Sequence, residues 1–514
     1  MPADHLEIET KFDVPPSYAV PELAGVDGVA SVDAPVEHRL EAQYFDTPDL
    51  RLARARITLR RRTGGPDDGW HVKLPASGDA RRELHQPLGR AVRRPPKAVV
   101  APVAGVLRGA VPVPVVQLRT RRVVTVLRGP DGRPLAEVAD DAVSATRLSG
   151  PDGAAEVRTW REVEVELLEG NRDLLEVVGE QLVAAGAERT ARASKLARAL
   201  GLEPGQSRPP EAARGKKGGK RRTAAGPSAG EAVLAALRQE VAALELADVG
   251  LRTGAEDGLR RMRIACRHLR GLLAAFRPVL DRAATEPLRD ELRRLAGRLS
   301  GCRDDEVAYA GLRAAVAGLP VELVLGPVVA RLQSGEVAAQ ERGRTQAAAV
   351  VAERAHLDLL EALHALLADP PLTGRAARPA DAVLAEVLRR EARRVRRSAS
   401  AAEGLTGAER TEALHALRRA ARRARYTAEV VTPVVGEPAR DVARAAKRTQ
   451  RLLGALQDLV VVGERCRQLA VSAHAAGEPG FTYGLLLGRA EARAQDAERA
   501  FAERWPALAR RLGG

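Results

Sequence analysis

The sequence predicts an α+β protein of two domains, the first built from antiparallel strands with a few helices and the second built only from helices. Two observations carry this prediction. Before about residue 202, apolar and charged residues alternate with period two, which is typical of half-buried strands. After about residue 230 the apolar period becomes 3.6, which is typical of amphipathic helices. The length of 514 residues also exceeds what a single hydrophobic core commonly supports.

The composition is that of a soluble globular protein, with 45% hydrophobic and 29% charged residues. The start lacks the basic stretch of a secretory signal, no run approaches about eighteen apolar residues, and the three cysteines form no CxxC motif. We therefore expect a cytoplasmic protein without a membrane span, a zinc cage or a disulfide framework. The net charge of +15 favours a polyanionic partner, whereas an aromatic content of 3% disfavours single-stranded nucleic acid.

Alternating segments in the first half are predicted as strands, and turn signals such as Gly64-Gly65-Pro66 separate them. They span residues 5–14, 57–63, 69–75, 115–127, 134–143 and 160–170. Two stretches, near 97–108 and 172–201, are predicted as helices. The first domain is therefore expected over residues 4–202.

Residues 203–229 combine Pro, Gly and Ser with a basic run, which predicts a flexible linker. The alternative interpretation is a polyanion-binding arm, since the segment holds seven basic and two acidic residues. The helical domain is then expected over residues 231–510. It contains an internal repeat, because a shift of 155 residues places Arg263, Arg267 and Arg270 on Arg418, Arg422 and Arg425.

Charged residues of the predicted strands recur at every second position and so share one face of each strand. A sheet with one face in water would explain any single strand, but the recurrence on four strands favours charged faces turned inward around a channel. Such a channel suits phosphate chains, since Arg and Lys neutralise phosphate oxygens while carboxylates hold Mg²⁺ or Mn²⁺. The sets are Glu7, Glu9 and Lys11; Arg60 with Arg62; Arg119 with Arg121; and Glu162, Glu164 and Glu166.

Six segments resemble, in order and spacing, those of the CYTH family of triphosphate tunnel metalloenzymes. They read HLEIETKF, YFDTPDLRLARARITLRRR, WHVKLP, LAEVADD, WREVEVEL and SKLARAL. The resemblance implies an antiparallel eight-stranded β-barrel tunnel that binds triphosphate compounds together with Mg²⁺ or Mn²⁺.

The resemblance also implies roles for individual residues. The metal ligands would be Glu7, Glu9, Glu164 and Glu166, with Glu137 added because it shares a face with Asp141 while Asp140 points outward. The phosphate-binding catalytic residues would be Arg60, Arg62, Lys73, Arg119 and Arg121, with Lys11 and Lys195 completing the basic lining. Glu162 is expected at the surface, Arg81 and Glu83 are left without a role, and His71 is expected to be structural.

A basic stripe recurs in both helical repeats. Arg260, Arg263, Arg267 and Arg270 fall within about 80° on a helix, and the second copy has His415, Arg418, Arg422 and Arg425. One such stripe is usually a solvated face, but its duplication favours a shared binding surface.

These segments resemble the two repeats of the CHAD family, which implies polyphosphate binding in a basic groove between two bundles. The resemblance covers about residues 231–510, with Arg260 in place of the usual first-repeat histidine and His268 at a nearby basic position. The expected polyphosphate-binding residues are Arg260, Arg263, Arg267, Arg270, His415, Arg418, Arg422, Arg425 and Lys447.

The sequence thus predicts an inorganic triphosphatase, a hydrolase of inorganic triphosphate or a related triphosphate compound, joined to a polyphosphate-binding domain. Association with polyphosphate granules would follow from that binding. The first alternative is a polyphosphate-binding protein without catalysis, which the carboxylates disfavour, because they gain nothing in a pure polyanion binder unless metals occupy them. The second is a nucleic-acid-binding protein, and a competition between polyphosphate and DNA separates the two ligands.

Overall fold

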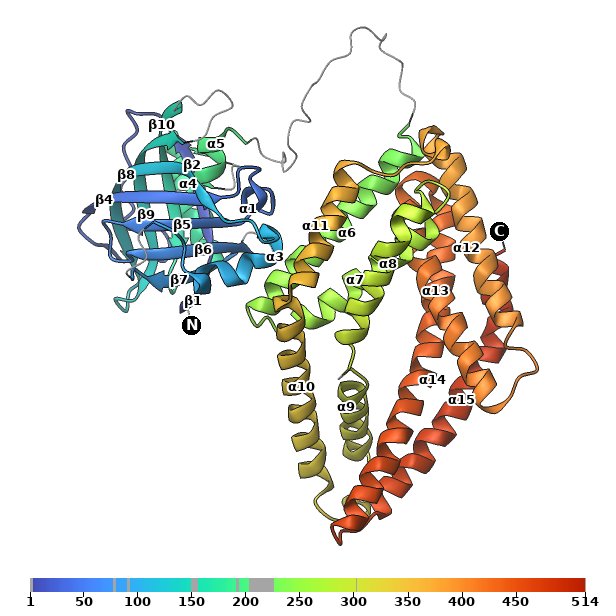
Figure 1. Ribbon diagram of the computed structural model, residues 1–514. Helices are drawn as coiled ribbons and strands as arrows, with labels where there is room; N and C mark the ends of the chain where they lie inside the picture. Colours follow the sequence, from blue (N-terminus) through green and yellow to red (C-terminus); the bar gives the residue numbers. More distant parts are fainter. Residues whose placement is uncertain are drawn as a thin grey trace. The chain divides into compact units, whose positions relative to one another are not determined.

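The computed structural model describes residues 3–76, 80–89, 93–148, 156–190, 194–202, 226–301 and 303–513. The chain divides into two compact units, residues 1–218 and 219–514, which are described separately (Figure 1). Most of the predicted linker, residues 203–225, lies outside the described part, as does Cys302.

The first unit contains an antiparallel sheet of eleven strands among its described residues. Their order is β1-β7-β6-β5-β4-β8-β9-β10-β2-β11, and β3 pairs with β8. The strands are β1 (Ala3–Glu7), β2 (Glu9–Val14), β3 (Ser31–Val32), β4 (Val36–Asp46), β5 (Thr58–Thr63), β6 (Gly69–Pro75), β7 (Arg81–Pro87), β8 (Val113–Arg128), β9 (Pro134–Arg147), β10 (Glu156–Leu167) and β11 (Glu188–Arg189).

This topology confirms the antiparallel sheet but corrects the eight-stranded barrel. The sheet is not closed by hydrogen bonds, because its order runs from β1 at one end to β2 and β11 at the other. The two ends are joined covalently, since only Ile8 separates β1, which pairs with β7, from β2, which pairs with β10. The chain therefore changes its pairing partner at Ile8.

Two helices cover apolar side chains of the sheet and leave the charged faces turned to the enclosed side. Helix α4 (Arg172–Ala184) packs Val178 and Leu182 against Phe12 and Val165 on the outer face. Helix α5 (Lys195–Leu200) packs Leu196 against a second cluster from β4, β8 and β9. The predicted helix 172–201 is thus two helices with β11 between them. The other predicted helical stretch consists of α2 (Lys97–Val100), η1 (Ala101–Val103) and α3 (Ala104–Leu107), and α1 (Arg51–Arg54) precedes β5.

The second unit is helical throughout its described residues. Its elements are α6 (Ala229–Arg252), α7 (Gly258–Ala275), α8 (Arg282–Arg298), α9 (Arg303–Ala317), η2 (Val321–Leu323), α10 (Val328–Ala352), α11 (Arg354–Ala368), η3 (Gly374–Ala377), α12 (Ala380–Ser400), α13 (Gly407–Val435), α14 (Glu437–Ala475) and α15 (Phe481–Arg511). Helix α6 begins with a capping box between Ser228 and Glu231, and Ala229 is fully buried. The last residues of the predicted linker therefore belong to this unit.

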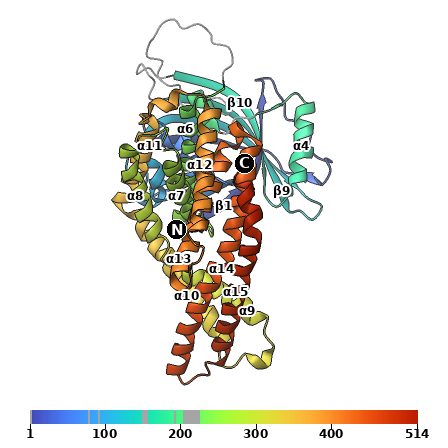
Figure 2. The same cartoon turned by 90° about the vertical axis from the view of Figure 1, so that its right-hand side faces the viewer.

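The helical unit has a large core and a smaller one. In the large core α6 packs on α7, α12 packs on α13, and α7 packs on α13, so the two predicted basic helices meet where the repeats join. The smaller core lies between α9, α10, α14 and α15, whose lower parts extend away from the other helices in Figures 1 and 2. Cys266 and Cys466 are free and buried.

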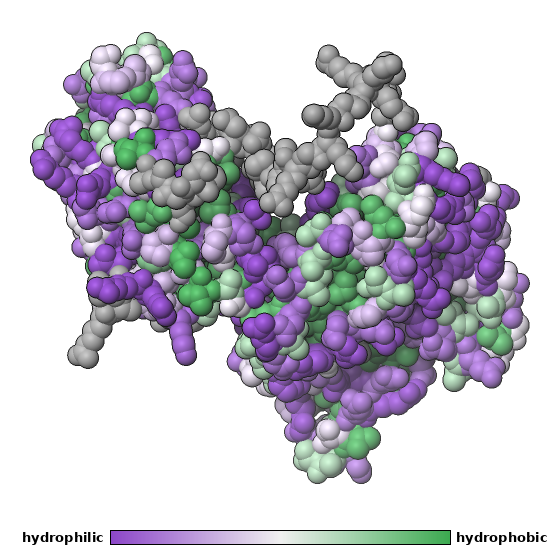
Figure 3. All heavy atoms as spheres, turned by 45° about the horizontal axis from the view of Figure 1, so that its top comes forward, coloured by the Kyte–Doolittle hydropathy of each residue, from purple (hydrophilic) through white to green (hydrophobic). Residues whose placement is uncertain are grey.

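Hydrophilic residues cover most of the face drawn in Figure 3, with small hydrophobic areas between them. Among the described residues, no helix combines the length and the apolar character that crossing a membrane requires.

Candidate functional site

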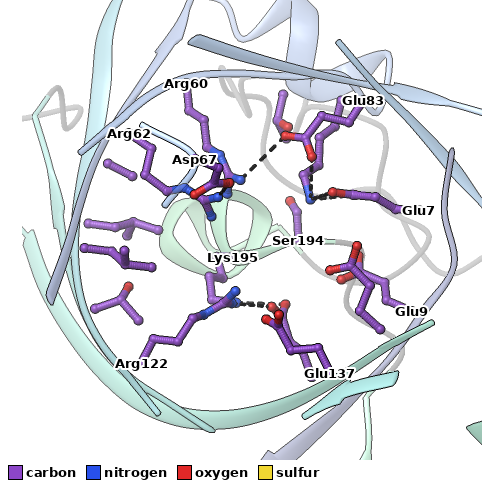
Figure 4. A pocket seen from close by; sticks show the side chains of 18 of the residues that line it. Glu7, Glu9, Arg60, Arg62, Asp67, Glu83, Arg122, Glu137, Ser194 and Lys195 are labelled. Carbon is purple, nitrogen blue, oxygen red and sulfur yellow. Dashed lines mark hydrogen bonds and ion pairs between the residues drawn. The ribbon is translucent and has the colours of Figure 1, made fainter. Parts of the chain in front are cut away.

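A cavity of about 360 Å³ lies inside the first unit and is lined by the inward faces of the strands and by α5 (Figure 4). Charged side chains dominate its wall. They are Glu7, Glu9, Lys11, Arg60, Arg62, Asp67, Lys73, Arg81, Glu83, Arg122, Glu137, Glu164, Glu166 and Lys195.

The charges are separated across this cavity. In Figure 4, Arg60, Arg62 and Arg122 reach in from one side, and Glu7 and Glu9 with Glu137 reach in from the facing side. The arginines come from β5 and β8, and the carboxylates come from β1, β2 and β9. An elongated anion bound together with a metal cation would fit this arrangement. The anion would lie toward the arginines and the cation toward the carboxylates.

The acidic side contains a row of three carboxylates on adjacent strands, named here the acid row. Glu166 of β10 is directly opposite Glu9 of β2 and directly opposite Glu137 of β9. Side chains opposite each other on neighbouring strands are about 5 Å apart at Cβ, so these charges repel. Burial, reinforced by the charges of Glu9 and Glu137, raises the pKa of Glu166, although Lys73 opposes the shift. Within the row, Lys11 donates to Glu9 at 3.0 Å, whereas Glu137 and Glu166 have no ion-pair partner among the described residues, so the row is short of positive charge.

Glu7 adjoins the acid row and is almost completely buried. Its two carboxylate oxygens lie 2.8 and 2.6 Å from Nζ of Lys73. Burial raises the pKa of Glu7 to about 8, because the opposing charge of Lys73 is offset by Glu83 and Glu166. The Glu83 carboxyl differs, since Lys73 and a hydrogen bond with His71 outweigh its burial and lower its pKa.

A second acidic group contains Asp141, Glu162 and Glu164, whose nearest oxygens lie within 4.8 Å of one another. This spacing would suit a metal, but the ammonium group of Lys195 already lies among them, at 2.9 Å from Asp141 and 2.7 Å from both glutamates. Arg122 adds bonds of 2.6–2.8 Å to Asp141 and Glu164. Burial would raise the pKa of Glu164, but Lys11, Lys195 and Arg122 hold it well below 4.5. This group is compensated by basic side chains.

On the arginine side each guanidinium has a carboxylate neighbour, but Arg62 is still repelled by the other two. Arg60 lies 3.6 Å from Glu83, and Arg62 pairs with Asp67 at the cavity wall. Burial, and then the charges of Arg60 and Arg122, lower the pKa of Arg62 to about 9. An anion bound here would relieve this repulsion.

Most of the predicted tunnel residues line the cavity, but two do not. Arg119 and Arg121 point outward, with 73% and 61% of their side chains exposed, and pair with Glu41 and Glu37 on the outer surface. The prediction that they line the interior is wrong by one position in the alternation. Arg122 faces inward instead, on the face it shares with Leu118 and Thr120. Leu118, which is apolar, lies on this face, but its burial and that of Thr120 are visible only in the structure.

Other acidic residues also differ from expectation. Glu162, expected at the surface, is buried and accepts bonds from Lys195 and from Nε1 of Trp160. Asp141 is buried on the face of Glu137, while Asp140 pairs with Arg161, as the alternation predicts. Glu83 and Arg81, which received no role, line the cavity.

In the helical unit, the structure brings four predicted arginines together where α7 meets α13. Arg267 and Arg270 come from α7, and Arg418 and Arg422 come from α13. Burial, with the charges of the other three, lowers the pKa of Arg422 to about 10, although Tyr426 opposes this. These four side chains, named here the central arginines, have no acidic partner within ion-pair distance among the described residues.

The remaining predicted residues of this unit lie elsewhere. Arg263 is buried and donates to the carbonyl of Leu299, so it holds α7 to the end of α8. His415 lines a separate cavity of about 260 Å³ between α13, α14 and α15. Arg260 and Lys447 are exposed. Arg425 pairs with Glu429 at 3.4 Å and lies over the ring of Tyr426.

Comparison with known sequences gives matches to both units. Residues 5–200 match the model of the CYTH domain, and residues 235–467 match the model of the CHAD domain. The uncharacterized proteins MT2285 and Rv2226, from two strains of Mycobacterium tuberculosis, are each 35% identical to this chain over 496 residues. Each match covers 94% of this chain and 93% of the relative.

Solved structures resemble parts of the chain. PptA from Streptomyces chartreusis has a TM-score of 0.44 and 21% identity, over 55% of this chain and 100% of its own. The CHAD domain from the plant Ricinus communis has a TM-score of 0.44 and 22% identity, over 54% of this chain and 92% of its own. A Hippeastrum protein described as having a dominant triphosphatase activity has a TM-score of 0.23 and 16% identity, over 38% of this chain and 95% of its own.

Proposed function

Because the chain belongs to the proteins that join a CYTH domain to a CHAD domain, we propose that it is a metal-dependent triphosphatase with an attached polyphosphate-binding domain. Its substrate in the first unit is inorganic triphosphate or a related triphosphate compound. The observation that carries this proposal is the charge separation in the cavity, with three arginines facing the acid row.

The arginine side would bind the phosphate chain. Guanidinium groups donate two parallel hydrogen bonds to phosphate oxygens, and Arg60, Arg62 and Arg122 point into one space from two strands. Substrate binding would add negative charge beside Arg62, whose pairing with Asp67 does not offset the charges of Arg60 and Arg122. Phosphoryl transfer depends mainly on such positioning and charge neutralisation, and the cavity provides both without a covalent intermediate.

The acid row fits Mg²⁺ or Mn²⁺. It offers only carboxylate oxygens, the ligands these hard cations prefer, and Glu137 and Glu166 have no basic partner within ion-pair distance among the described residues. Glu9 would complete the set through the oxygen that Lys11 does not contact, and Glu7, whose two oxygens both contact Lys73, would join by exchanging that partner for the ion. Such an ion, when bound, would neutralise phosphate oxygens and lower the pKa of a coordinated water. Glu164, predicted as a ligand, is instead held by Lys11, Lys195 and Arg122.

The lysines of the cavity would stabilise the departing phosphate. Lys11, Lys73 and Lys195 each approach the cavity from a different element and each carries a carboxylate partner that fixes its position. Fixed positive charges aimed at developing negative charge require little reorganisation during the reaction. The lysines would then act on the departing phosphate, and the arginines would bind the phosphate chain of the substrate.

The helical unit would bind polyphosphate at the central arginines. Four guanidinium groups without acidic partners gain most from an anion that carries many charges. Binding there would keep long-chain polyphosphate at the protein, and any association with polyphosphate granules would follow from it.

Phosphate release by the purified chain tests the proposal. The substrates are inorganic triphosphate, long-chain polyphosphate, ATP and thiamine triphosphate, each with Mg²⁺, with Mn²⁺ and with EDTA. We expect release from inorganic triphosphate only with a divalent cation. Binding of these compounds without any release would show instead that the first unit is a polyphosphate-binding module.

A further inference from the structure

A second group of arginines lies beside the central arginines and belongs to neither predicted stripe. Its members come from the turn that follows α7, from α8 and from α12, and α8 and α12 belong to different repeats. Helix α8 packs on α7, and α13 packs on both α7 and α12, so all four helices form one region of the unit (Figure 1). The group, named here the lateral arginines, consists of Arg277, Arg289, Arg390 and Arg394.

Two of the lateral arginines share a single carboxylate. Arg277 donates to Glu286 at 2.8 Å, and Arg289 pairs with the other oxygen of the same residue. Arg282 lies 3.8 Å from Glu286 as well. One negative charge therefore holds three guanidinium groups and neutralises only part of their charge.

Arg390 and Arg394, the other two lateral arginines, also have too few carboxylate neighbours to balance their charge. The buried Glu391 accepts two bonds from Arg423, at 2.5 and 2.8 Å, and lies 3.7 Å from Arg390. Arg394 has no acidic partner within ion-pair distance among the described residues. Burial and the charge of Arg423 lower the pKa of Arg394, with Arg289 adding to the shift and Glu391 opposing it. The region thus carries more positive charge than Glu286 and Glu391 can balance.

The lateral arginines are continuous with the central ones through Arg270. Burial, followed by the charge of Arg289, lowers the pKa of Arg270. Arg270 in turn contributes to the lowered pKa of Arg422 on α13. The packing of α8 on α7, of α7 on α13 and of α12 on α13 places these guanidinium groups in one region, where the charges of Arg270, Arg289 and Arg422 are linked in this way.

The distance covered is longer than a short phosphate chain needs. Arg267 lies eight residues before Ala275, the last residue of α7, which corresponds to roughly 12 Å along the helix axis, and Arg277 lies beyond that end. A triphosphate placed on the central arginines would therefore not reach the lateral ones. A long chain could neutralise both groups at once.

We propose that Arg277, Arg289, Arg390 and Arg394 form a second polyphosphate subsite, which extends the central one and makes the helical unit prefer long chains. This inference rests on the proposed function of the helical unit and adds the path that the polyphosphate follows on it. The ligand is a flexible linear polyanion, because the arginines follow a path over three helices and include no aromatic platform for bases.

The test is the affinity of the full-length protein for long-chain polyphosphate, measured with EDTA so that the first unit does not hydrolyse the chain. The subsite variant carries Arg289→Gln and Arg394→Gln. Loss of two charge-assisted contacts should weaken binding about tenfold or more, and the preference for longer over shorter chains should shrink. Thermal unfolding of each variant verifies that it is folded.

The matched control carries Arg294→Gln and Arg393→Gln, which lie on the same two helices, five positions from Arg289 and one position from Arg394, and both are exposed. It removes the same charge from α8 and α12 but should change the affinity less than about twofold. A third variant, Arg267→Gln with Arg422→Gln, reports on the central arginines alone.

The outcomes separate this inference from the function on which it rests. Equal losses in the subsite and control variants would overturn the inference, since binding would then depend only on net charge. So would a normal affinity in the subsite variant when the central variant has lost binding, a result that leaves polyphosphate binding itself intact. Absence of binding by the wild-type protein would overturn both proposals.

Discussion

Glu166 stands in the middle of three carboxylates on adjacent strands, and this position makes it costly to the fold when no cation is bound. Cross-strand like charges destabilise a sheet by up to about 1 kcal/mol per pair. We expect Glu166→Gln to abolish metal-dependent phosphate release and, at the same time, to raise the melting temperature of the metal-free protein. Calorimetry and a phosphate assay measure the two effects.

Glu162→Gln is the matched control, since it makes the same chemical change on the same strand. Glu162 bonds to Lys195, so its loss leaves a buried ammonium with one partner fewer and should destabilise the protein by about 1–3 kcal/mol. If both variants lowered the melting temperature alike, the acid row would not be short of positive charge.

Arg121 and Arg122 are adjacent in sequence and lie on opposite faces of β8. Arg122→Gln should lower kcat/KM for inorganic triphosphate by about 10- to 100-fold, because it removes a charged donor to the substrate. Arg121→Gln should stay within about twofold of wild type, since this side chain pairs with Glu37 on the outer surface. The reverse order would show that β8 presents its other face to the cavity.

The raised pKa of Glu7 predicts how stability depends on pH in the metal-free protein. Between about pH 6.5 and the folded-state pKa of about 8, the folded chain retains a proton that the unfolded chain has lost. Stability should therefore fall as the pH rises through this window, by at most about 2 kcal/mol. His71, with a pKa lowered to about 4 by burial, contributes only below about pH 6.5.

Urea unfolding at several pH values with EDTA measures this dependence. Glu7→Gln removes the titrating group, so the fall between pH 6.5 and 8 should become flat. An unchanged slope in that variant would assign the titration to a different residue.

At the scale of elements, α7 and α13 act as a pair because each repeat contributes one of them. Arg267→Glu with Arg422→Glu should weaken long-chain polyphosphate binding far more than Arg261→Glu with Arg419→Glu. Both pairs change the charge equally on the same two helices, but Arg261 and Arg419 are exposed and pair with Asp257 and Glu412. The difference in polyphosphate affinity between the two double variants should become smaller in high salt, because salt screens exposed charges. Equal affinities at low salt would argue against a defined groove.

The sequence predicts the type of most elements but not always their faces or their ends. In β8 two arginines at alternate positions suggested an inward face, yet the burial of Leu118 and Thr120 decides the orientation, and burial depends on strands far away in sequence. The predicted helix 172–201 ends early because Gly186 has φ 102°, a conformation suited to glycine that stops a helix. Local sequence patterns do not show these outcomes, because they depend on contacts with distant parts of the chain.

At the scale of the whole molecule, residues that form one site come from distant parts of the sequence. The arginine stripes were visible because they repeat within single helices. The lateral arginines were not, since α8 and α12 belong to different repeats and reach one region only through their packing on α7 and α13. Likewise, nothing near Lys195 in the sequence indicates that its ammonium lies among three carboxylates.

The net charge of +15 raises the question of nucleic acid as a competing ligand. We expect long-chain polyphosphate to displace bound DNA at fixed salt, whereas DNA should displace polyphosphate poorly. Both ligands share a counterion-release term, but only the flexible chain can follow guanidinium groups across three helices. Fluorescence anisotropy with each ligand labelled in turn measures this. Equal displacement in both directions would favour general polyanion binding.

The change of pairing partner at Ile8 also determines when the first unit can fold. Lys11 is bonded to Glu164, a residue 153 positions later, so β2 stays without its partner until β10 has been synthesised. Pairings this remote in sequence form slowly, because a long loop must close before any contact is gained. The acid row is assembled by that same pairing. During synthesis, β2 therefore remains an unpaired edge, exposed to chaperones and to aggregation. It stays unpaired for longer than the helices of the second unit, whose hairpin partners follow closely in the sequence.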